Sequence, residues 1–391
     1  MTRIKVAVFF GGVSFEHDVS ILTGLQVCQA LPIAKYEALP VYADKTGRMW
    51  TGAALLDAKA YPVKDFGGLR RVEVVAGPAL RAEGFFRPGL LPFDVAFPAF
   101  HGGAGESGGI QGLFEILGIP CAGPDVASAA ISMSKLATKR FCRDLGIKVL
   151  PENALRKPAG GEFFDIGKVV GGVSLPLPVI VKPEALGSSV AVAKAQSRDE
   201  LAAGVLEVFK VDRIALVEPF VPHLVEYNVA VMRGAEGRTL TSVIEMPKND
   251  GKLLSFADKY LSRGGAKKKG AAPLSAMPSD ETVRSRRDFA PHLAPAQEEF
   301  IRASAASLYE ALGMTAAAPR IDYLCDGETG ELWLNEINPI PGAMAFYLWE
   351  NSEHRISYPS LIDTLITSAL ADAKAKAVSI DLSRFGSAIF K

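Results

Sequence analysis

Two polar residues near the C-terminal end of the chain, Glu336 and Asn338, close an apolar, alternating stretch, LWLNEIN, that predicts a β-strand. Side chains two residues apart on a strand point to the same face, so a carboxylate and an amide lie side by side. Pro339, Pro341 and Gly342 follow directly, and the two prolines stiffen the chain there. This arrangement favours a rigid binding platform over an ordinary polar turn.

The preceding stretch, PRIDYLC, predicts a partner strand with Arg320 and Asp322 on one face, joined to the last strand by the turn DGETGE. Folding the two strands about this turn places Asp322 roughly opposite Asn335 and Glu336. Three oxygen donors and a guanidinium then converge on one surface. Hard oxygen ligands that are too few to enclose an ion suit Mg²⁺ when phosphates complete its octahedron. The alternative is a solvated hairpin face with a surface Arg–Asp pair.

A second candidate site is the stretch LPVIVKPEALGSSVAV, in which a buried strand delivers Lys182 to a loop. The glycine and the two serines of that loop can present backbone N–H groups and hydroxyls to an anion. The loop is not a Walker A motif, because GxxxxGK[ST] is absent. A strand–loop–strand turn with a surface lysine explains the same pattern equally well.

Two glycine-rich segments carry acidic residues. In GGVSFEHDVS a glycine turn opens a helix, but GxGxxG is absent and Glu16 and Asp18 would repel a pyrophosphate, so the segment suits an ammonium group instead. In FHGGAGESGGIQG several glycines flank Glu106 beside His101, and the alternative is a flexible crossing loop.

Composition excludes several classes of protein. The 391 residues, 49% of them hydrophobic, predict a large core in two or three domains. Lys and Arg total 43, as do Asp and Glu, so the basic excess expected of a nucleic-acid binder is absent. The four cysteines are scattered without metal-site or disulfide spacing, as in a reducing compartment. Neither a signal peptide nor a membrane span is predicted, so a cytoplasmic protein is expected.

The pattern of elements predicts an α/β protein. Residues 4–10 form a continuous apolar run that ends in a glycine turn and is followed by a helix from Ser20, as expected of a buried parallel strand. A second strand, Phe93 to Phe100, leads to the helix GLFEILG. Between them, residues 41–92 predict a hairpin or an edge-strand excursion.

Further along, helices and strands alternate. A helix through SKLATKRFCRDLG stops at Gly146, and the strands LPVIVK and VAVAKA precede a helix whose Ser197 and Glu200 form a capping box. From Glu218 onwards strands dominate, until a long helix from about Gln297 to Leu312. The stretch SRGGAKKKGAA predicts a mobile basic loop.

Five motifs in this order resemble the D-alanine:D-alanine ligase family of the ATP-grasp superfamily: GGVSFEHDVS, HGGAGESGGIQG, IVKPEALGSSV, DKY and RIDYLCD…NEINPIPG. The resemblance covers nearly the whole chain, and the combination is specific although each motif alone is not. It implies an N-terminal α/β domain (1–126), a central ATP-grasp subdomain (127–218) and a C-terminal one (219–391), with a lid near 255–275 that orders on closure. Such enzymes phosphorylate one D-amino acid with ATP and let the amine of a second attack the acyl phosphate.

The resemblance also implies a role for each matching residue. Residues that would bind two Mg²⁺ (or Mn²⁺) ions are Asp322, Glu336 and Asn338. Residues that would contact ATP are Lys135, Lys182 and Lys259 at the phosphates, and Glu218, Val221 and Glu226 at the adenine and ribose. Residues that would act on the amino acids are Arg320 and the N–H of Gly342 as the oxyanion hole, Asp18 with Ser188 and Tyr260 as a hydrogen-bonded set, and His101, Tyr347 and Leu348 as substrate contacts.

Two substrate positions depart from the family. Asp18 stands where Glu is usual, which shortens the reach to an ammonium by roughly 1.5 Å, and a misplacement of about 1 Å can cost on the order of 10²-fold in rate. Tyr347 stands where a small Ser is usual and fills space that the Ser would leave open. The retained pair Lys259 and Tyr260 favours an amine over a hydroxyl nucleophile, because relatives that make esters lack it.

The first hypothesis is therefore an ATP-dependent ligase that forms D-alanyl-D-alanine for peptidoglycan synthesis, a homodimer by family resemblance. The closest alternative keeps the chemistry and changes one or both amino acids. A non-catalytic ATP-binding protein is a third possibility, which the set Arg320, Asp322, Glu336 and Asn338 argues against. A nicotinamide oxidoreductase lacks its phosphate fingerprint.

Overall fold

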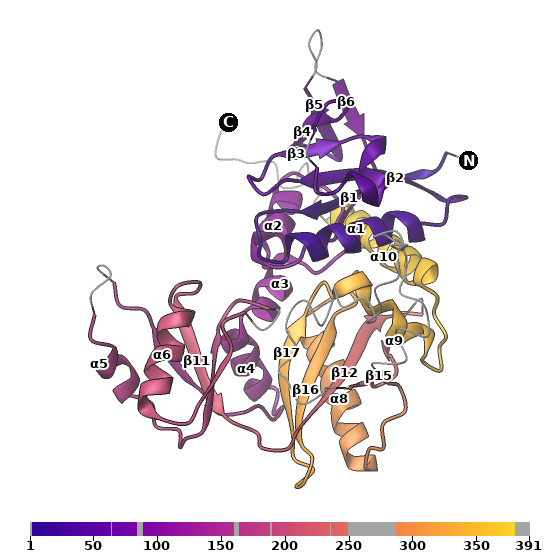
Figure 1. Ribbon diagram of the computed structural model, residues 1–391. Helices are drawn as coiled ribbons and strands as arrows, with labels where there is room; N and C mark the ends of the chain where they lie inside the picture. The colour runs from indigo at the N-terminus through magenta and orange to yellow at the C-terminus, as the bar shows by residue number, and fades with distance from the viewer. Residues whose placement is uncertain are drawn as a thin grey trace, which may run out of the picture.

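Three sheets of four or more strands, each covered by its own helices, form the framework of the molecule (Figure 1). The computed structural model describes residues 2–63, 65–83, 89–159, 164–187, 190–234, 236–248 and 287–379. The α/β fold class predicted from the sequence is confirmed. The predicted lid, 255–275, and the basic loop within it lie outside the described residues.

The N-terminal sheet has seven strands in the order β6-β5-β4-β3-β2-β1-β7. The central strand β1 (Ile4–Gly11) pairs in parallel with β2 (Tyr36–Ala43) and β7 (Val95–Pro98). Its alternate residues enter two different cores, which is why its sequence is continuously apolar. The remaining strands are antiparallel: β3 (Met49–Thr51), β4 (Arg70–Val75), β5 (Ala79–Ala82) and β6 (Gly89–Pro92). The segment predicted as a hairpin or edge excursion thus extends the sheet.

Helix α1 (His17–Ala30) follows β1 and begins three residues before the predicted start at Ser20. The Ser20 hydroxyl is buried in the first turn, where it accepts a hydrogen bond from Gly11 N and donates one to Ala99 O, both at 2.8 Å. Ser20 therefore ties α1 to the ends of β1 and β7 rather than capping the helix. Two further helices follow β7: α2 (Gly109–Ile116) and α3 (Val126–Met133).

The central sheet is antiparallel, in the order β10-β9-β11-β8. Its elements are β8 (Asn153–Arg156), β9 (Val179–Pro183), β10 (Ala193–Ala195), β11 (Ile214–Pro219), α4 (Lys135–Asp144), α5 (Ile166–Gly171) and α6 (Arg198–Val208). At the start of α6 the Ser197 hydroxyl accepts from Glu200 N, as predicted, but the Glu200 carboxylate accepts from Gln196 N at 2.7 Å, one residue before the cap.

The third sheet has the order β13-β12-β16-β17, with the two-stranded β14-β15 beside it. Its elements are β12 (Leu224–Arg233), β13 (Thr239–Thr241), β14 (Met246–Pro247), β15 (Arg287–Asp288), β16 (Arg320–Asp326), β17 (Leu332–Asn338) and α8 (Pro295–Ala311). The long helix predicted from Gln297 to Leu312 is confirmed to within two residues.

The C-terminal segment returns to the first sheet. The short turn η5 (Gly342–Ala345) leads to α9 (Phe346–Glu350) and α10 (Tyr358–Ser379), and α10 packs against α1 and β7 (Figure 1). One hydrophobic core therefore joins Val8 and Leu25 to Trp349 and Ile362. The three predicted domains remain a prediction, but the first sheet is completed by residues from the far end of the chain.

The cysteines and the apolar character of the helices were also predicted from the sequence. The four cysteines are free, and burial raises the pKa of Cys28, Cys121 and Cys142 to about 12, so these thiols stay neutral. Among the described helices, none combines the length and the apolar character that crossing a membrane requires.

Candidate active site

The hairpin of β16 and β17 brings the predicted ligand residues together. Asp322 pairs directly with Glu336, and Arg320 with Asn338, with a bulge between Asp322 and Tyr323. The bulge leaves Asn335 as the extra residue, so of the two partners predicted for Asp322, Glu336 is the one directly opposite it.

Every charge on this face has a neighbour of opposite sign. The Arg320 guanidinium donates from Nε and Nη2 to the two oxygens of Asp322, at 2.7 Å each, and Asn338 Nδ2 donates to Asp322 Oδ2 at 3.0 Å. Lys135 Nζ lies 3.5 Å from Glu336 Oε2. The side chains of Arg320 and Asp322 are only 15% and 16% exposed, which excludes the alternative of a solvated hairpin face.

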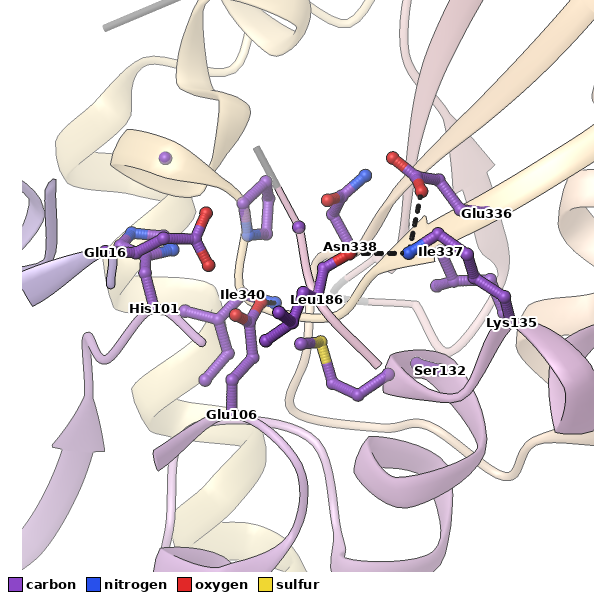
Figure 2. A pocket seen from close by; sticks show the side chains of 14 residues that line it. Glu16, His101, Glu106, Ser132, Lys135, Leu186, Glu336, Ile337, Asn338 and Ile340 are labelled. Carbon is purple, nitrogen blue, oxygen red and sulfur yellow. Dashed lines mark hydrogen bonds and ion pairs between the residues drawn. The ribbon is translucent and has the colours of Figure 1, made fainter. Parts of the chain in front are cut away.

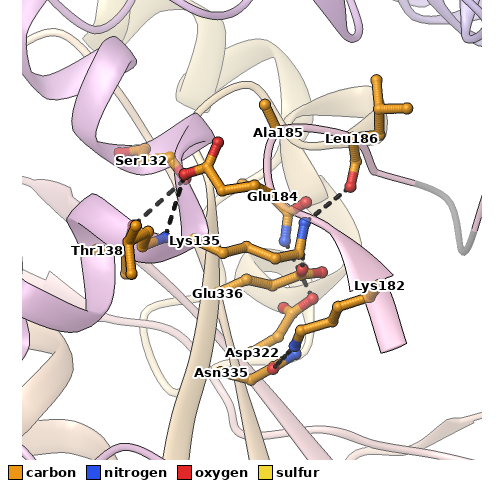
Figure 3. Close-up of polar contacts among 12 residues, drawn as sticks. Ser132, Lys135, Thr138, Lys182, Glu184, Ala185, Leu186, Asp322, Asn335 and Glu336 are labelled. Atoms are coloured by element: carbon orange, nitrogen blue, oxygen red, sulfur yellow. Dashed lines mark hydrogen bonds and ion pairs between the residues drawn. The ribbon is translucent and has the colours of Figure 1, made fainter. Parts of the chain in front are cut away.

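Lys135 reaches this face from the first turn of α4. Ser134 caps the helix by accepting from Ala137 N at 3.1 Å and also bonds the Glu184 carboxylate, which fixes the start of α4 against the end of β9. Lys135 Nζ then donates to Leu186 O at 2.7 Å, so one ammonium joins the loop after β9 to the hairpin (Figure 3). The neighbouring Ser188, predicted to act in the lid, lies outside the described residues.

Lys182 is part of a buried charge cluster between the central sheet and the hairpin. Its Nζ donates to Asn335 Oδ1 at 3.0 Å (Figure 3) and lies 2.7 Å from Glu218 Oε2. Lys139 Nζ lies 2.8 Å from the other Glu218 oxygen. Burial would raise the pKa of Glu218, but the two ammonium groups outweigh it and lower the pKa. Glu218 is therefore a carboxylate held between two lysines.

Sequence reasoning missed Lys139, whose side chain is only 1% exposed. Burial lowers the pKa of this lysine, although Glu218 opposes the shift. The signal was present, because Lys135 and Lys139 stand four residues apart on a predicted helix and thus share a face. The other predicted nucleotide contacts lie nearby in sequence: Val221 is buried, and Glu226 is half-buried on β12.

A pocket lies beside this polar face, where the three parts of the molecule meet. Figure 2 shows Glu16, His101 and Glu106 on one side of the pocket, with Lys135, Glu336 and Asn338 on the other. The remaining lining residues are Ser132, Met133, Leu186, Gly187, Ile337, Ile340, Pro341 and Gly342. The motifs around His101, Lys182 and Glu336 therefore border one space, as the resemblance implied.

Of the two acidic residues of the N-terminal motif, Glu16 lines the pocket, whereas Asp18, to which the ammonium contact was assigned, does not. Helix α1 begins at His17, so Asp18 lies on its exposed side while Glu16 precedes the helix and faces the pocket. A Cβ on Gly102 would lie 2.7 Å from Glu16 Oε2, and one on Gly187 would lie 3.2 Å from Oε1. The carboxyl group thus packs against two glycines, and the argument from a shortened side chain no longer applies.

His101 and Glu106 are buried in the wall of the pocket. Burial, assisted by the charge of Arg320, lowers the pKa of His101 to about 3, so its ring is neutral and contacts the Thr23 hydroxyl at 2.8 Å. Burial and the nearby Glu16 raise the pKa of Glu106 to about 8, against the two backbone N–H groups that its oxygens accept from.

The predicted substrate contacts after Gly342 do not line the pocket with their side chains. Leu348 is fully buried in the core. The Tyr347 phenol donates to Glu245 Oε1 at 3.3 Å, and the Arg287 guanidinium stacks over its ring at 4.0 Å. Arg287 Nη1 also donates to both oxygens of Glu245, at 2.7 Å each. Sequence reasoning missed this cluster, because its three members are distant in the chain.

The residues that would hold ATP and a divalent metal fit both groups. Asp322, Glu336 and Asn338 provide hard oxygens on one strand face, and Lys135 and Lys182 direct ammonium groups to the same region. No cluster of three His, Cys, Asp or Glu side chains placed to hold a metal occurs in the described ranges. The predicted Lys259 and Tyr260 lie outside those ranges.

Comparisons with known proteins cover almost the whole chain. The family model "D-ala D-ala ligase N-terminus" matches residues 5–124, and "D-ala D-ala ligase C-terminus" matches residues 141–367. The chain is 34% identical to the D-alanine–D-alanine ligase of Sodalis glossinidius (95% of this chain, 97% of that one) and 31% identical to that of Thermosipho melanesiensis (97% of each). It is also similar to the solved D-alanine-D-alanine ligase of Coxiella burnetii, with a TM-score of 0.75 at 24% identity over 98% and 99% of the two chains.

Proposed function

The chain belongs to the D-alanine–D-alanine ligase family, ATP-dependent and ADP-forming enzymes with the ATP-grasp fold, and from this premise we propose that it joins two molecules of D-alanine to D-alanyl-D-alanine for peptidoglycan synthesis. The observation that carries this proposal is the meeting of two unlike surfaces. A charge-paired face with Lys135, Lys182, Asp322 and Glu336 adjoins a pocket that is lined by carboxyl groups.

On the nucleotide side, the lysines are suited to the phosphates of ATP and the hairpin oxygens to two Mg²⁺ or Mn²⁺ ions. We assign Lys135, Lys182 and Lys259 to the phosphates, and Asp322, Glu336 and Asn338 to the metals. A bound divalent metal would neutralise the charge that develops on the transferring phosphoryl group. We assign Glu218, Val221 and Glu226 to the adenine and ribose.

On the amino-acid side, the Glu16 carboxylate is suited to the ammonium group of the first D-alanine, with His101 beside its carboxylate. Phosphorylation of that carboxylate gives an acyl phosphate, and the amine of the second D-alanine attacks its carbonyl carbon and releases inorganic phosphate. We assign Arg320, whose strand partner Asn338 lines the pocket, and the N–H of Gly342, which also lines it, to stabilise the oxyanion that forms in this attack. Ser188 and Tyr260 would close the site.

A second candidate function keeps this chemistry and changes the second amino acid. It is favoured by one observation, the bulky cluster of Tyr347, Arg287 and Glu245 at the position where the family has a small Ser. The Tyr347 hydroxyl donates its proton to Glu245, so it could donate to the carboxylate of the second amino acid, as the Ser would, only after breaking that bond. Homodimer formation and a cytoplasmic location remain predictions.

The test is phosphate release from ATP and Mg²⁺ with D-alanine alone, compared with D- and L-amino acids singly and in pairs, with products identified by mass. Phosphate release with D-alanine alone and a D-alanyl-D-alanine product is the expected result. Release that requires a different amino acid beside D-alanine would establish the second candidate. No release with any pair would reject ligase activity and leave a nucleotide-binding protein.

A further inference from the structure

The turn that carries the Gly342 N–H is strained. Ala343, Met344 and Ala345 all lie in the left-handed region, with φ of 50°, 54° and 49°. Non-glycine residues rarely adopt this conformation, and it persists only where the surroundings hold it. Within the turn, Met344 N donates to Pro341 O at 2.8 Å, which closes the curve without holding it in place relative to the pocket.

Two side chains from the N-terminal part of the molecule hold the turn on either side of Gly342. Ile340 N donates to Glu106 Oε1 at 3.4 Å, and Ala343 N donates to Thr23 Oγ1 at 3.3 Å. These residues are separated from the turn by more than 230 positions in the chain. The backbone on both sides of the Gly342 N–H is therefore tied to a different part of the fold.

Both holding groups are themselves fixed. Glu106 Oε2 accepts from Gly102 N at 2.7 Å, and Thr23 Oγ1 lies 2.8 Å from His101 Nε2. Thr23, His101 and Glu106 are 1%, 5% and 5% exposed, so solvent does not compete for these bonds. In Figure 2, Glu106 lies below Ile340, with His101 and Glu16 close by on the same side of the pocket.

A contribution to stability does not by itself explain why a carboxyl group is buried at position 106. A buried carboxyl group costs free energy unless its hydrogen bonds are satisfied, and no lysine or arginine among the described residues forms an ion pair with it. Its two oxygens serve two backbone N–H groups from separate loops, of which one precedes the oxyanion donor by two residues. An apolar residue could fill the space but could not hold the turn.

We propose that Thr23 and Glu106 are positioning residues that hold the strained turn 339–345, and with it the N–H of Gly342, in place at the pocket. The inference rests on the proposed function for the role of that N–H, whereas the holding itself is a property of the fold. Small displacements of a donor matter, because a misplacement of about 1 Å can cost on the order of 10²-fold in rate.

The test compares Thr23→Val with Thr23→Ser. Val keeps the size and loses the hydroxyl, whereas Ser keeps the hydroxyl. We expect Val to lower kcat by about 10- to 100-fold with KM for ATP unchanged, and Ser to recover most of kcat. Thr51→Val is the matched control, because Thr51 is equally buried and donates to Pro40 O at 2.6 Å in the N-terminal sheet.

Hydrogen exchange of the peptide that spans residues 338–348 separates this inference from the proposed function. Thr23→Val and Glu106→Leu are both expected to speed exchange in this peptide by about tenfold, since each removes the side-chain acceptor of one backbone N–H in the turn. Thr51→Val should leave the exchange of this peptide unchanged. Unchanged exchange in both active-site variants would overturn the inference, whether or not the wild-type enzyme makes a dipeptide. Equal loss of kcat in Thr23→Val and Thr23→Ser would assign Thr23 to packing and overturn it as well.

Discussion

The two sides of the candidate site are built on opposite electrostatic plans. On the nucleotide side, each carboxylate has a cation beside it: Asp322 with Arg320, Glu336 with Lys135, and Glu218 with two lysines. On the amino-acid side, Glu106 is held by backbone N–H groups and His101 is neutral. The nucleotide side suits a phosphate chain that binds together with divalent cations. The amino-acid side suits a small zwitterion.

The difference explains how each side is kept in shape before any ligand binds. Ion pairs hold the nucleotide side, and they can exchange partners when phosphates and metals arrive. Hydrogen bonds to backbone hold the amino-acid side, including the strained turn after Pro341. The role proposed for the N–H of Gly342 requires these bonds to stay unchanged. Replacing an ion-paired side chain should therefore change the turnover of ATP. Replacing a side chain that bonds the turn should change the position of the Gly342 N–H.

The largest expected effect is that of Glu336→Ala. We expect ATP turnover to fall about 10³-fold, because no other side chain can replace the carboxylate that we assign to the metal. The thermal midpoint should change little, because Lys135, the ion-pair partner of Glu336, keeps its hydrogen bond to Leu186 O. Glu331→Ala on the same hairpin is the control, since its ion pair with Lys148 is about half exposed and contributes little. Near-normal turnover in Glu336→Ala would remove the metal assignment.

Next in size is the effect of Lys139→Met on stability. Removing one partner from a buried ion pair costs about 3 to 5 kcal/mol, and the remaining Lys182 should place the loss of unfolding free energy at the lower end. Urea unfolding measures it. Lys210→Met provides the comparison, because its ion pair with Glu207 is more than 60% exposed and should matter little. A loss below about 1 kcal/mol for Lys139→Met would show that the cluster does not depend on this lysine.

A smaller effect is expected from Tyr347→Ser on the choice of the second amino acid. Removing the ring opens space beside the Arg287–Glu245 ion pair, so the ratio of kcat/KM for a larger D-amino acid to that for D-alanine should rise about tenfold, the range that one or two methylene groups provide. Tyr347→Phe keeps the ring and should keep the ratio. An unchanged ratio in Tyr347→Ser would place the cluster outside the second subsite.

The last expected effect is the pH dependence of stability that Glu106 contributes. Its pKa is raised from 4.5 to about 8, so the folded state binds this proton more tightly than the unfolded state. The contribution to stability is complete below pH 4.5 and is lost as pH rises through about 8. The charged groups that influence it are Glu16 and Arg320, while His101 stays neutral here.

Thermal midpoints between pH 6 and 9 measure this contribution. The wild-type midpoint should fall across that range more steeply than the midpoint of Glu106→Gln, which cannot titrate. Parallel curves for the two proteins would mean that Glu106 is already ionised at pH 6, and that the amino-acid side carries an uncompensated charge.

Patterns local in the chain predicted much of the fold and of the nucleotide side. The strand at Ile4–Gly11, the helix at Pro295–Ala311 and the hairpin of Asp322 and Glu336 follow from apolar periodicity and turn residues. The start of α1 was placed three residues late, so Asp18 lies within the helix and not before it. The bonds of Ser20 to the ends of β1 and β7 join segments that no local pattern relates.

The sequence by itself determined which polar residues share a strand face or a helix end, because these faces follow from periodicity, and its five ordered motifs carried the resemblance to the ligase family. Only the tertiary structure decided that Glu16 rather than Asp18 faces the pocket, that Lys139 completes the Glu218 cluster, and that Tyr347 turns to Glu245 and Arg287. It also decided that Thr23 and Glu106 hold the turn around Gly342. The physical reason is that these contacts join segments far apart in the chain, and periodicity specifies the face of an element but not what packs against it.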